Sequence, residues 1–416
     1  MIRAQQQRSG WQRALLLMAA FGTLAPDQGV ADEPNTLTLS VAETVQRDNN
    51  LFRLPDGLSP VINGVPGSRG DTLSSTQLGL RFAHTYGRQD LRANVNYAIN
   101  KYREYAYLDY NPLNLGLNMD WQVGNHWRGS LVAEQAQSLT NFANTRGFQQ
   151  TTNTYRRSGG DANYWWHPDW ATGVGVYALQ NRYSGNSQPL DDYDAAVAEL
   201  KLTYQPRSGN RVGLLYRHTD ASYPNRSTPV LGLSLLDTGF GQEDLRATAN
   251  WQLSGASRLD GQLGFTRLRY DVLSNRDFQG VTGNLNYAWQ PSAKTSLNAA
   301  VSREIGPRQD VTGDYVANYV LTSSVTLAPT WLATEKTSLQ ATVKWLNEVY
   351  PGVPLGLSSV FPRREDRTWL LGLTAGYNPT RKLSFRMAVQ QQKRDSNYPG
   401  DQYNDTTASI TGALTW

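Results

Sequence analysis

Apolar and polar side chains alternate with a period of two along most of this chain, in segments of roughly ten residues. The pattern is clear in LRANVNYAI (Leu91 to Ile99), in Leu113 to Val123 and in the final TASITGALTW (Thr407 to Trp416). Successive side chains of a strand point to opposite faces, so each such segment predicts a half-buried β-strand. The whole chain gives about eighteen candidate strands, with sixteen as the alternative.

The connections between these segments alternate in length. Short turns follow every second strand, for example GRQD (87–90), GNH (124–126) and HPD (167–169), whereas long loops cover 48–71, 220–242 and 349–366. We also expect a strand over 315–327 and a turn over 328–336. Alternating connections predict an all-β, antiparallel, up-and-down transmembrane barrel with periplasmic turns and extracellular loops. A propeller would show a fixed repeat, and a sandwich would have fewer strands.

The N-terminus carries an export signal. Three arginines precede ALLLMAAFGTLA (Ala14 to Ala25), which is too short to span a bilayer, and small residues allow cleavage after Ala31. Residues 1–31 are therefore predicted to be a signal peptide and residues 32–416 the outer-membrane barrel. No later apolar run reaches the roughly twenty residues of a transmembrane helix, so we expect no helical anchor.

Closure of the sheet into a barrel within lipid predicts which side chains of each strand face the lipid and which face the lumen. The apolar set contacts lipid, and aromatic residues gather at the membrane interfaces. Near the short turns and the chain end, the predicted membrane anchors are Trp121, Trp127, Trp251, Trp289 and Trp416. Trp416 also resembles the terminal aromatic signal of outer-membrane barrels, and Leu37 to Val45 is the predicted pairing partner of the last strand.

The inward set of the same strands is predicted to line a substrate path. Its bases are Arg81, Arg92, Arg128, Lys201, Arg211, Arg217, Arg246, Lys344 and Arg386, and its acids include Asp120, Glu134 and Glu199. A positive bias in a confined channel favours anions. The alternative is that these side chains pair with one another and stiffen the wall. Glu43 falls on the outward set of the first strand, which puts the register there in doubt.

Two long loops contain residues with a candidate role at the channel mouth. DNNLFRLPDG carries Leu51, Phe52, Arg53 and Leu54, which are too apolar for a solvated tip and predict a constriction or gating loop. The stretch Ser227 to Gly241 is a second candidate plug. A third loop presents possible sugar-stacking rings at Tyr102, Tyr105, Tyr107 and Tyr110.

Composition and motifs argue against an enzyme. The absence of cysteine excludes disulfides and thiolate chemistry, and the net charge of +4 is too small to indicate nucleic acid as a partner. The four histidines are scattered, and neither a nucleophile elbow nor a zinc-binding spacing occurs. We therefore expect no catalytic residue, no metal and no cofactor.

Two stretches of the N-terminal half carry a family resemblance. RDNNLFRLPDG and GDTLSSTQLGLRFAHTYGRQDLRANVNYAINKY, together with the terminal strand, resemble the EpsL-type outer-membrane β-barrels encoded with exosortase-associated exopolysaccharide operons in Gram-negative bacteria, within a broader porin-like family. The resemblance implies polysaccharide export in biofilm formation and a periplasmic polysaccharide co-polymerase or export protein as partner. Outer-membrane lipid and the barrel assembly machinery are the other expected partners.

Three functional hypotheses follow. The first is an outer-membrane channel that exports an acidic exopolysaccharide through a basic lumen gated by the first long loop. The second is a diffusion porin, either general or selective for anions or oligosaccharides. The third is a barrel enzyme that modifies lipid or glycan, since a Ser-His-acid site can be assembled from different strands.

Overall fold

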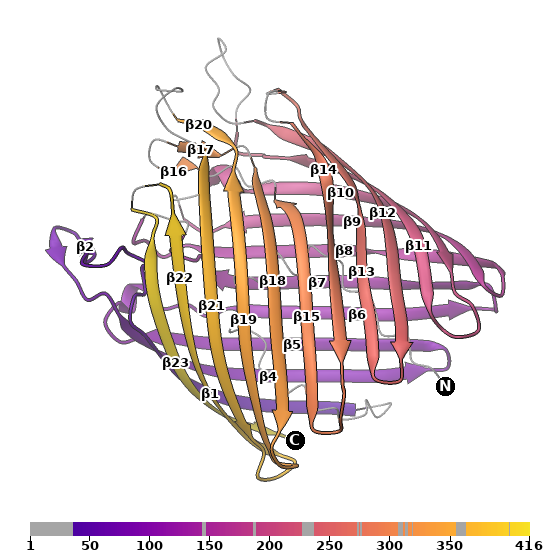
Figure 1. Cartoon of the computed structure of the whole chain (residues 1–416), viewed down its shortest axis with the longest axis horizontal. Helices are drawn as coiled ribbons and strands as arrows, with labels where there is room; N and C mark the ends of the chain where they lie inside the picture. Colours follow the sequence, from indigo (N-terminus) through magenta and orange to yellow (C-terminus); the bar gives the residue numbers. More distant parts are fainter. Residues whose placement is uncertain are drawn as a thin grey trace.

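The computed structural model describes residues 36–143, 147–185, 189–226, 237–272, 274, 277–306, 311–312, 315–317, 319–354, 363–398 and 400–416. Its main element is a single 18-stranded antiparallel sheet closed into a barrel (Figure 1). The strands of the wall are β1 (Thr36–Asp48), β4 (Asp71–Tyr86), β5 (Gln89–Tyr102), β6 (Leu113–Val123), β7 (Trp127–Leu139), β8 (Thr152–His167), β9 (Trp170–Tyr183), β10 (Tyr193–Tyr204), β11 (Arg211–Ser222), β12 (Gly239–Ser254), β13 (Ser257–Tyr270), β14 (Phe278–Trp289), β15 (Thr295–Gly306), β18 (Val320–Leu332), β19 (Thr337–Tyr350), β21 (Arg364–Tyr377), β22 (Leu383–Ser396) and β23 (Tyr403–Thr415).

Pairing of the first and last strands closes the ring. β1 and β23 are antiparallel from Ser40↔Thr415 to Asp48↔Thr407. The Trp416 N–H donates to the Leu39 carbonyl oxygen at 2.9 Å, and the Leu39 N–H donates to the Trp416 carbonyl oxygen at 3.1 Å. The predicted pairing of the last strand with Leu37 to Val45 is confirmed, as is the count of eighteen strands.

The two ends of the barrel differ in the length of their connections. Turns such as 87–88, 124–126 and 255–256 join neighbouring strands at the end where the C-terminus lies (Figure 1). The opposite end carries the long loops and the short elements β2 (Val61–Ile62), β3 (Val65–Pro66), η1 (Ala106–Leu108), η2 (Pro189–Asp191), β16 (Val311–Thr312), β17 (Tyr315–Ala317) and β20 (Gly352–Pro354). This is the layout of an outer-membrane barrel, with the long loops outside the cell.

One predicted strand lies five residues further along the chain than expected. The strand expected over 315–327 is β18, and the turn expected over 328–336 shrinks to 333–336. Pro329 suggested a turn, but it pairs with Leu297 of β15, and the ladder between β18 and β19 skips Ala328 and Pro329. A proline is tolerated there because its missing N–H faces an interrupted ladder.

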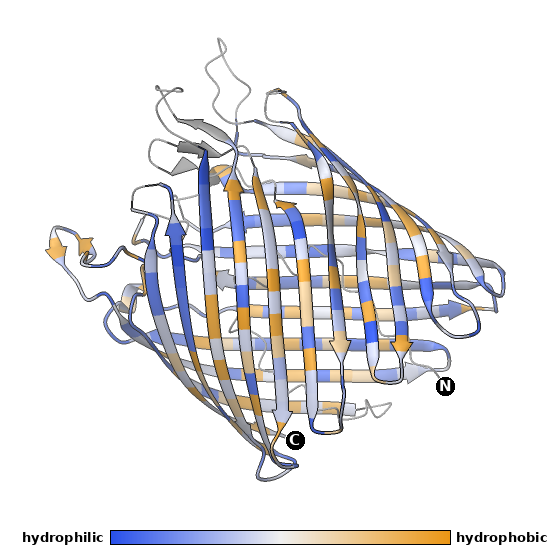
Figure 2. Ribbon diagram, viewed as in Figure 1, coloured by the Kyte–Doolittle hydropathy of each residue, from blue (hydrophilic) through white to orange (hydrophobic). Residues whose placement is uncertain are grey.

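The outer face of the wall is apolar and the inner face polar. Val176 and Leu373 are 66% and 68% exposed on the outside, whereas Asp244, Thr266 and Thr282 are fully buried on the inside. Figure 2 shows hydrophobic and hydrophilic residues alternating along the strands. Among the described residues, no helix is long and apolar enough to cross a membrane. The closed barrel with an apolar outer surface places the chain in the outer membrane.

Glu43 is a real exception on the outer face, and the doubt about the register of β1 was wrong. Glu43 pairs with Thr76 of β4 and Gly412 of β23 in an unbroken register. Its two carboxylate oxygens accept hydrogen bonds from Ser74 Oγ and Thr76 Oγ1, each at 2.6 Å. Two local hydroxyl donors therefore offset part of the cost of an outward-facing carboxylate.

The tryptophans form a partial belt at the short-turn end. Among the predicted anchors, Trp127, Trp251, Trp289 and Trp416 are exposed outward, and Trp121 is partly covered. Trp331 of β18 belongs to the same belt, and half of its surface is exposed. It was not among the predicted anchors, because the predicted strand ended at residue 327. Residues 1–31, predicted to be a signal peptide, lie outside the described residues.

We predict that deletion of Trp416 impairs assembly more than channel properties, because it removes both terminal hydrogen bonds of the seam and an interface anchor. Heat-resistant folded protein in outer membranes, measured by gel mobility, should fall several-fold. Trp416→Phe, which keeps the backbone and an aromatic ring, should restore most of it. Normal amounts of the deletion variant would contradict this role.

Candidate functional site: the lumen and its mouth

Ion pairs cover one inner wall of the barrel. Glu199 on β10 contacts Lys201 Nζ at 2.9 Å and Arg217 Nη2 on β11 at 2.7 Å. Lys201 also lies 3.7 Å from Asp161 on β8, which accepts a hydrogen bond from Ser130 of β7. These links join β7, β8, β10 and β11 across the intervening β9, and they neutralise most of the charge that they bury.

The same wall continues in both directions. Asp244 on β12 accepts a hydrogen bond from Arg246 at 2.8 Å and from Thr266 of β13. Arg92 of β5 pairs with Asp120 of β6. For Arg92, Lys201, Arg217 and Arg246, the structure thus favours the alternative that predicted lumen bases stiffen the wall.

Five other predicted bases face the lumen without a carboxylate within ion-pair distance among the described residues. They are Arg81 of β4, Arg128 of β7, Arg211 of β11, Lys344 of β19 and Arg386 of β22. Their contacts are neutral where the structure gives any: the guanidinium of Arg128 lies 5.1 Å from the Trp165 ring centroid, and Arg211 donates to Gln205 Oε1 at 3.1 Å.

The inward acids are mostly engaged. Glu134 faces Arg157 across the β7–β8 ladder, and Asp260 pairs with Arg258 at 2.8 Å. Asp90, at the short-turn end, accepts a hydrogen bond from Thr85. Among the described inward side chains, more bases than acids therefore lack an oppositely charged partner.

The first long loop folds into an apolar cluster at the mouth. The Phe52 side chain is 3% exposed and meets the rings of Tyr105, Phe142 and Phe148 edge-on, each with a centroid distance of 4.9 Å. Leu51 and Leu54 pack against the same cluster. Three separate loops, 49–70, 103–112 and 140–151, thus meet around one phenylalanine.

Arg53 fastens this cluster to the barrel wall. Its Nη1 lies 2.9 Å from Asp48 Oδ2 at the end of β1 and 3.1 Å from Asp405 Oδ1 on β23. Burial disfavours the guanidinium charge, but the two carboxylates outweigh it and raise the pKa of Arg53 above its usual range. Arg53 has a φ of 55°, an uncommon value for a side-chain-bearing residue, so the tight backbone turn also fixes its direction.

A second fastening lies on the other side of the seam. Arg394 of β22 donates from Nη1 to the Ala143 carbonyl oxygen at 2.8 Å, although the two residues are 251 positions apart. Arg394 also lies 3.5 Å from Glu348 and 3.6 Å from Asp366. The loop after β7 therefore reaches the inner wall near β22 and narrows the mouth.

The tyrosine loop does not present four free rings. Tyr105 is 8% exposed and its hydroxyl donates to the Ser68 carbonyl oxygen, so the sugar-stacking prediction is wrong for this residue. Tyr102 and Tyr110 are partly covered, and only Tyr107 of the four is exposed, at 42%. Partial burial, with Tyr105 nearby, raises the pKa of Tyr107 to about 12, so the ring stays neutral.

Sequence reasoning missed the residues that join distant segments. Phe142, Phe148 and Arg394 had no assigned role, although two phenylalanines in the polar stretch NFANTRGFQQ were a usable signal. Of the second candidate plug, Ser227 to Gly241, residues 227–236 lie outside the described residues.

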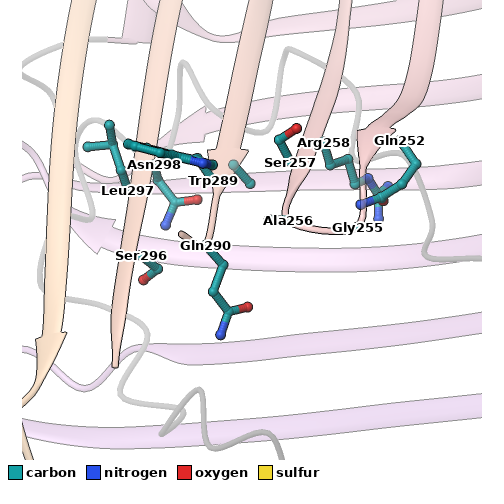
Figure 3. Close-up of a pocket in the computed structure, with 11 residues that line it drawn as sticks. Gln252, Gly255, Ala256, Ser257, Arg258, Trp289, Gln290, Ser296, Leu297 and Asn298 are labelled. Atoms are coloured by element: carbon teal, nitrogen blue, oxygen red, sulfur yellow. The ribbon is translucent and has the colours of Figure 1, made fainter. Parts of the chain in front are cut away.

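A small pocket at the short-turn end and the histidines were the other candidates for a binding or chemical site. A pocket of about 320 Å³ at the short-turn end lies between the β12–β13 and β14–β15 turns and is lined by Arg258, Trp289 and Asn298 among others (Figure 3). No group of three or more histidine or acidic side chains among the described residues is placed to hold a metal. The described histidines come from different elements: His126 lies in the β6–β7 turn, His167 is the last residue of β8, and His218 faces outward on β11 beside Glu243.

Several solved structures of Pseudomonas aeruginosa proteins are similar to this chain. OccK2 (OpdF) in complex with glucuronate has 13% identity and a TM-score of 0.48, with 92% of this chain and 98% of that chain covered. OpdK has 13% identity and a TM-score of 0.47, with 92% and 99% covered, and OpdQ has 11% and 0.47, with 92% and 100% covered. No protein-family model and no curated protein matches the sequence. The similarity is one of fold.

We predict that Arg53→Gln loosens the mouth, because Asp48 and Asp405 then lose their shared cation. Breaking a buried ion pair costs about 3–5 kcal/mol, so the loop should become sensitive to added protease while the barrel stays intact. Arg69→Gln is the comparison variant in the same loop, since Arg69 pairs with the exposed Asp56 at 3.5 Å and donates to the Leu54 carbonyl oxygen at 3.1 Å but, among the described residues, does not contact the barrel wall through an ion pair. Equal protease resistance of both variants would show that Arg53 does not hold the loop.

Proposed function

We propose that this chain is an outer-membrane diffusion channel that favours small hydrophilic anions. The observation that carries the proposal is a set of lumen bases that have no carboxylate within ion-pair distance in the described parts of the chain: Arg81, Arg128, Arg211, Lys344 and Arg386. Cationic side chains along a confined aqueous path attract anions more strongly than they would in open water, and they repel cations. The balanced ion pairs of the lumen add stiffness and little net charge.

The mouth supports selection by size as well as by charge. Phe52 and the two loops around it narrow the extracellular opening, while Arg53 and Arg394 are held by acids and have little charge left for a solute. A solute therefore meets a mouth narrowed by these packed loops first and the lumen bases afterwards. This order suits a small acid, such as a sugar acid, better than a neutral solute.

The test is ion selectivity in planar bilayers. We predict that the wild-type channel passes chloride in preference to potassium, and that the triple variant Arg81→Gln, Arg128→Gln, Arg386→Gln lowers the chloride-to-potassium permeability ratio several-fold. Arg269→Gln, on the outer face of β13, should leave the ratio unchanged. A cation-selective wild type, or a triple variant that behaves as wild type, would overturn the proposal.

A second candidate is export of an acidic exopolysaccharide, with a periplasmic co-polymerase or export protein as partner. One observation favours it: the stretch RDNNLFRLPDG, which carries the resemblance to EpsL-type proteins, contains Phe52 and Arg53, the two residues that fasten the mouth cluster. A polymer would need this cluster to move aside. The residues that support the resemblance are thus also those that a gate would need.

Removing residues 48–71 distinguishes the two candidates. For a gated exporter we predict a mostly closed wild-type channel that opens on this deletion. For a diffusion porin we predict a channel that is already open and changes conductance little. In the native host, normal surface polysaccharide after gene deletion, with none retained in the periplasm, would rule out the export hypothesis.

A further inference from the structure

The outer wall carries a groove of about 860 Å³ across β5 to β11. It is unexpected because the outside of a closed barrel is convex. The strand register explains it: one outward row crosses seven strands as Ala93, Leu117, Ala133, Ser158, Ala178, Ala196 and Asp220. Five of these seven side chains are alanine or serine, so the row forms a low floor.

Taller side chains border this floor on the side of the short turns. Leu131 and Val176, one outward position nearer those turns, are 52% and 66% exposed. Gly160 lies in the same bordering row, and a Cβ there would lie only 2.6 Å from Leu131 Cδ2. Strands β7 and β8 are therefore packed closely at this point.

The opposite border changes character along its length. It begins with Val95 and Leu115 and continues across the strands as Gln135, Arg156, Gln180, Asp194 and Ser222. Strands in a barrel are tilted, so a row across them climbs from the apolar belt toward the extracellular rim. The groove is apolar at its β5 end and polar at its β11 end.

Of the charged residues on the polar border, Asp194 is neutralised by an ion pair and Arg156 is not. Arg182 neutralises Asp194, with Nη2 at 2.6 Å from Oδ2. Arg156 instead donates hydrogen bonds to two neutral groups, Gln135 Oε1 at 2.9 Å and Gln180 Oε1 at 3.0 Å. In the part of the chain that the structure describes, no carboxylate lies within ion-pair distance of Arg156. Two further acids line the groove: Asp220 lies at its far end, and Glu134, on the inward set of β7, faces Arg157 across the ladder. The middle of the polar border is therefore a cation without a counter-charge.

We propose that this groove binds an anionic phosphorylated glycolipid of the outer leaflet, with an acyl chain on the small-residue floor and a phosphate at Arg156. An acyl chain fills a shallow apolar trough without requiring a matching ridge, and it is present at this depth in the bilayer. Arg156 has donor capacity left for a phosphate oxygen, and charge-assisted bonds of this kind are strong. A second copy of the chain would have to insert a ridge at the same place.

Two variants separate the chain site from the phosphate site. Ala178→Phe fills the floor, and Arg156→Gln removes the charge while keeping a polar side chain. Their matched controls are Ala408→Phe on the outer face of β23 and Arg269→Gln on that of β13. Folding of every variant is checked by heat-modified gel mobility, which a barrel that fails to assemble would not show.

Native mass spectrometry of the purified barrel, titrated with bis-phosphorylated lipid A or with phosphatidylethanolamine, provides the measurement. Ala178→Phe should weaken binding of both lipids at least tenfold. Arg156→Gln should weaken lipid A by about tenfold and phosphatidylethanolamine by less, because the single phosphate of phosphatidylethanolamine is offset by its own ammonium group. Variants that bind lipid A as wild type does, or controls that lose it equally, would overturn the proposal. So would oligomers that Ala178→Phe dissociates while lipid binding is unchanged, because the groove would then be a subunit interface.

Discussion

The hydrocarbon core of a membrane offers no water to hydrogen-bond a free backbone group, so this sheet is stable there only if its two edges meet. The contact between β1 and β23 meets that requirement, down to the paired backbone groups of Leu39 and Trp416. Once the edges are joined, each strand has a fixed register. A shift by one residue would exchange the lipid-facing and lumen-facing side chains of a whole strand.

Closure also determines where charge can be placed. The outer face must be largely apolar, so nearly every charged group of the wall faces the lumen or lies near a rim. Inside, acids and bases at neighbouring register positions pair, as Glu199 and Arg217 do on β10 and β11. Because buried pairs cancel, the electrostatic character of the channel depends on the bases left without an acid. Arg81 and Arg386 belong to this group because their strands place no acid beside them.

The sequence predicts local periodicity well and distant contacts poorly. A period of two predicted the number of strands, the place of every wall strand except β18 to within a few residues, and the outward face of the last one, since these depend only on neighbouring residues. Pro329 misplaced β18, because its tolerance depends on which neighbouring ladder is interrupted there. The contact between Arg394 and Ala143 had no local signal, since it depends on how far a loop reaches across the mouth. Tyr105 appeared free in the sequence, and only the fold shows that Phe52 covers it.

The groove was hidden for a related reason. Ala133, Ser158 and Ala178 are ordinary strand residues taken singly, and they form a floor only because the register aligns them across β7, β8 and β9. Glu43 and Arg156 show how the outer face treats a charge. The carboxylate of Glu43 is held by two hydroxyl groups of its own wall, whereas Arg156 is held by two neutral amide oxygens that leave its charge uncancelled. A charge that is hydrogen-bonded by its own strands, as Glu43 is, can be explained by stability alone. The charge of Arg156, which is not neutralised and lies beside an apolar groove, is placed to bind a charged ligand.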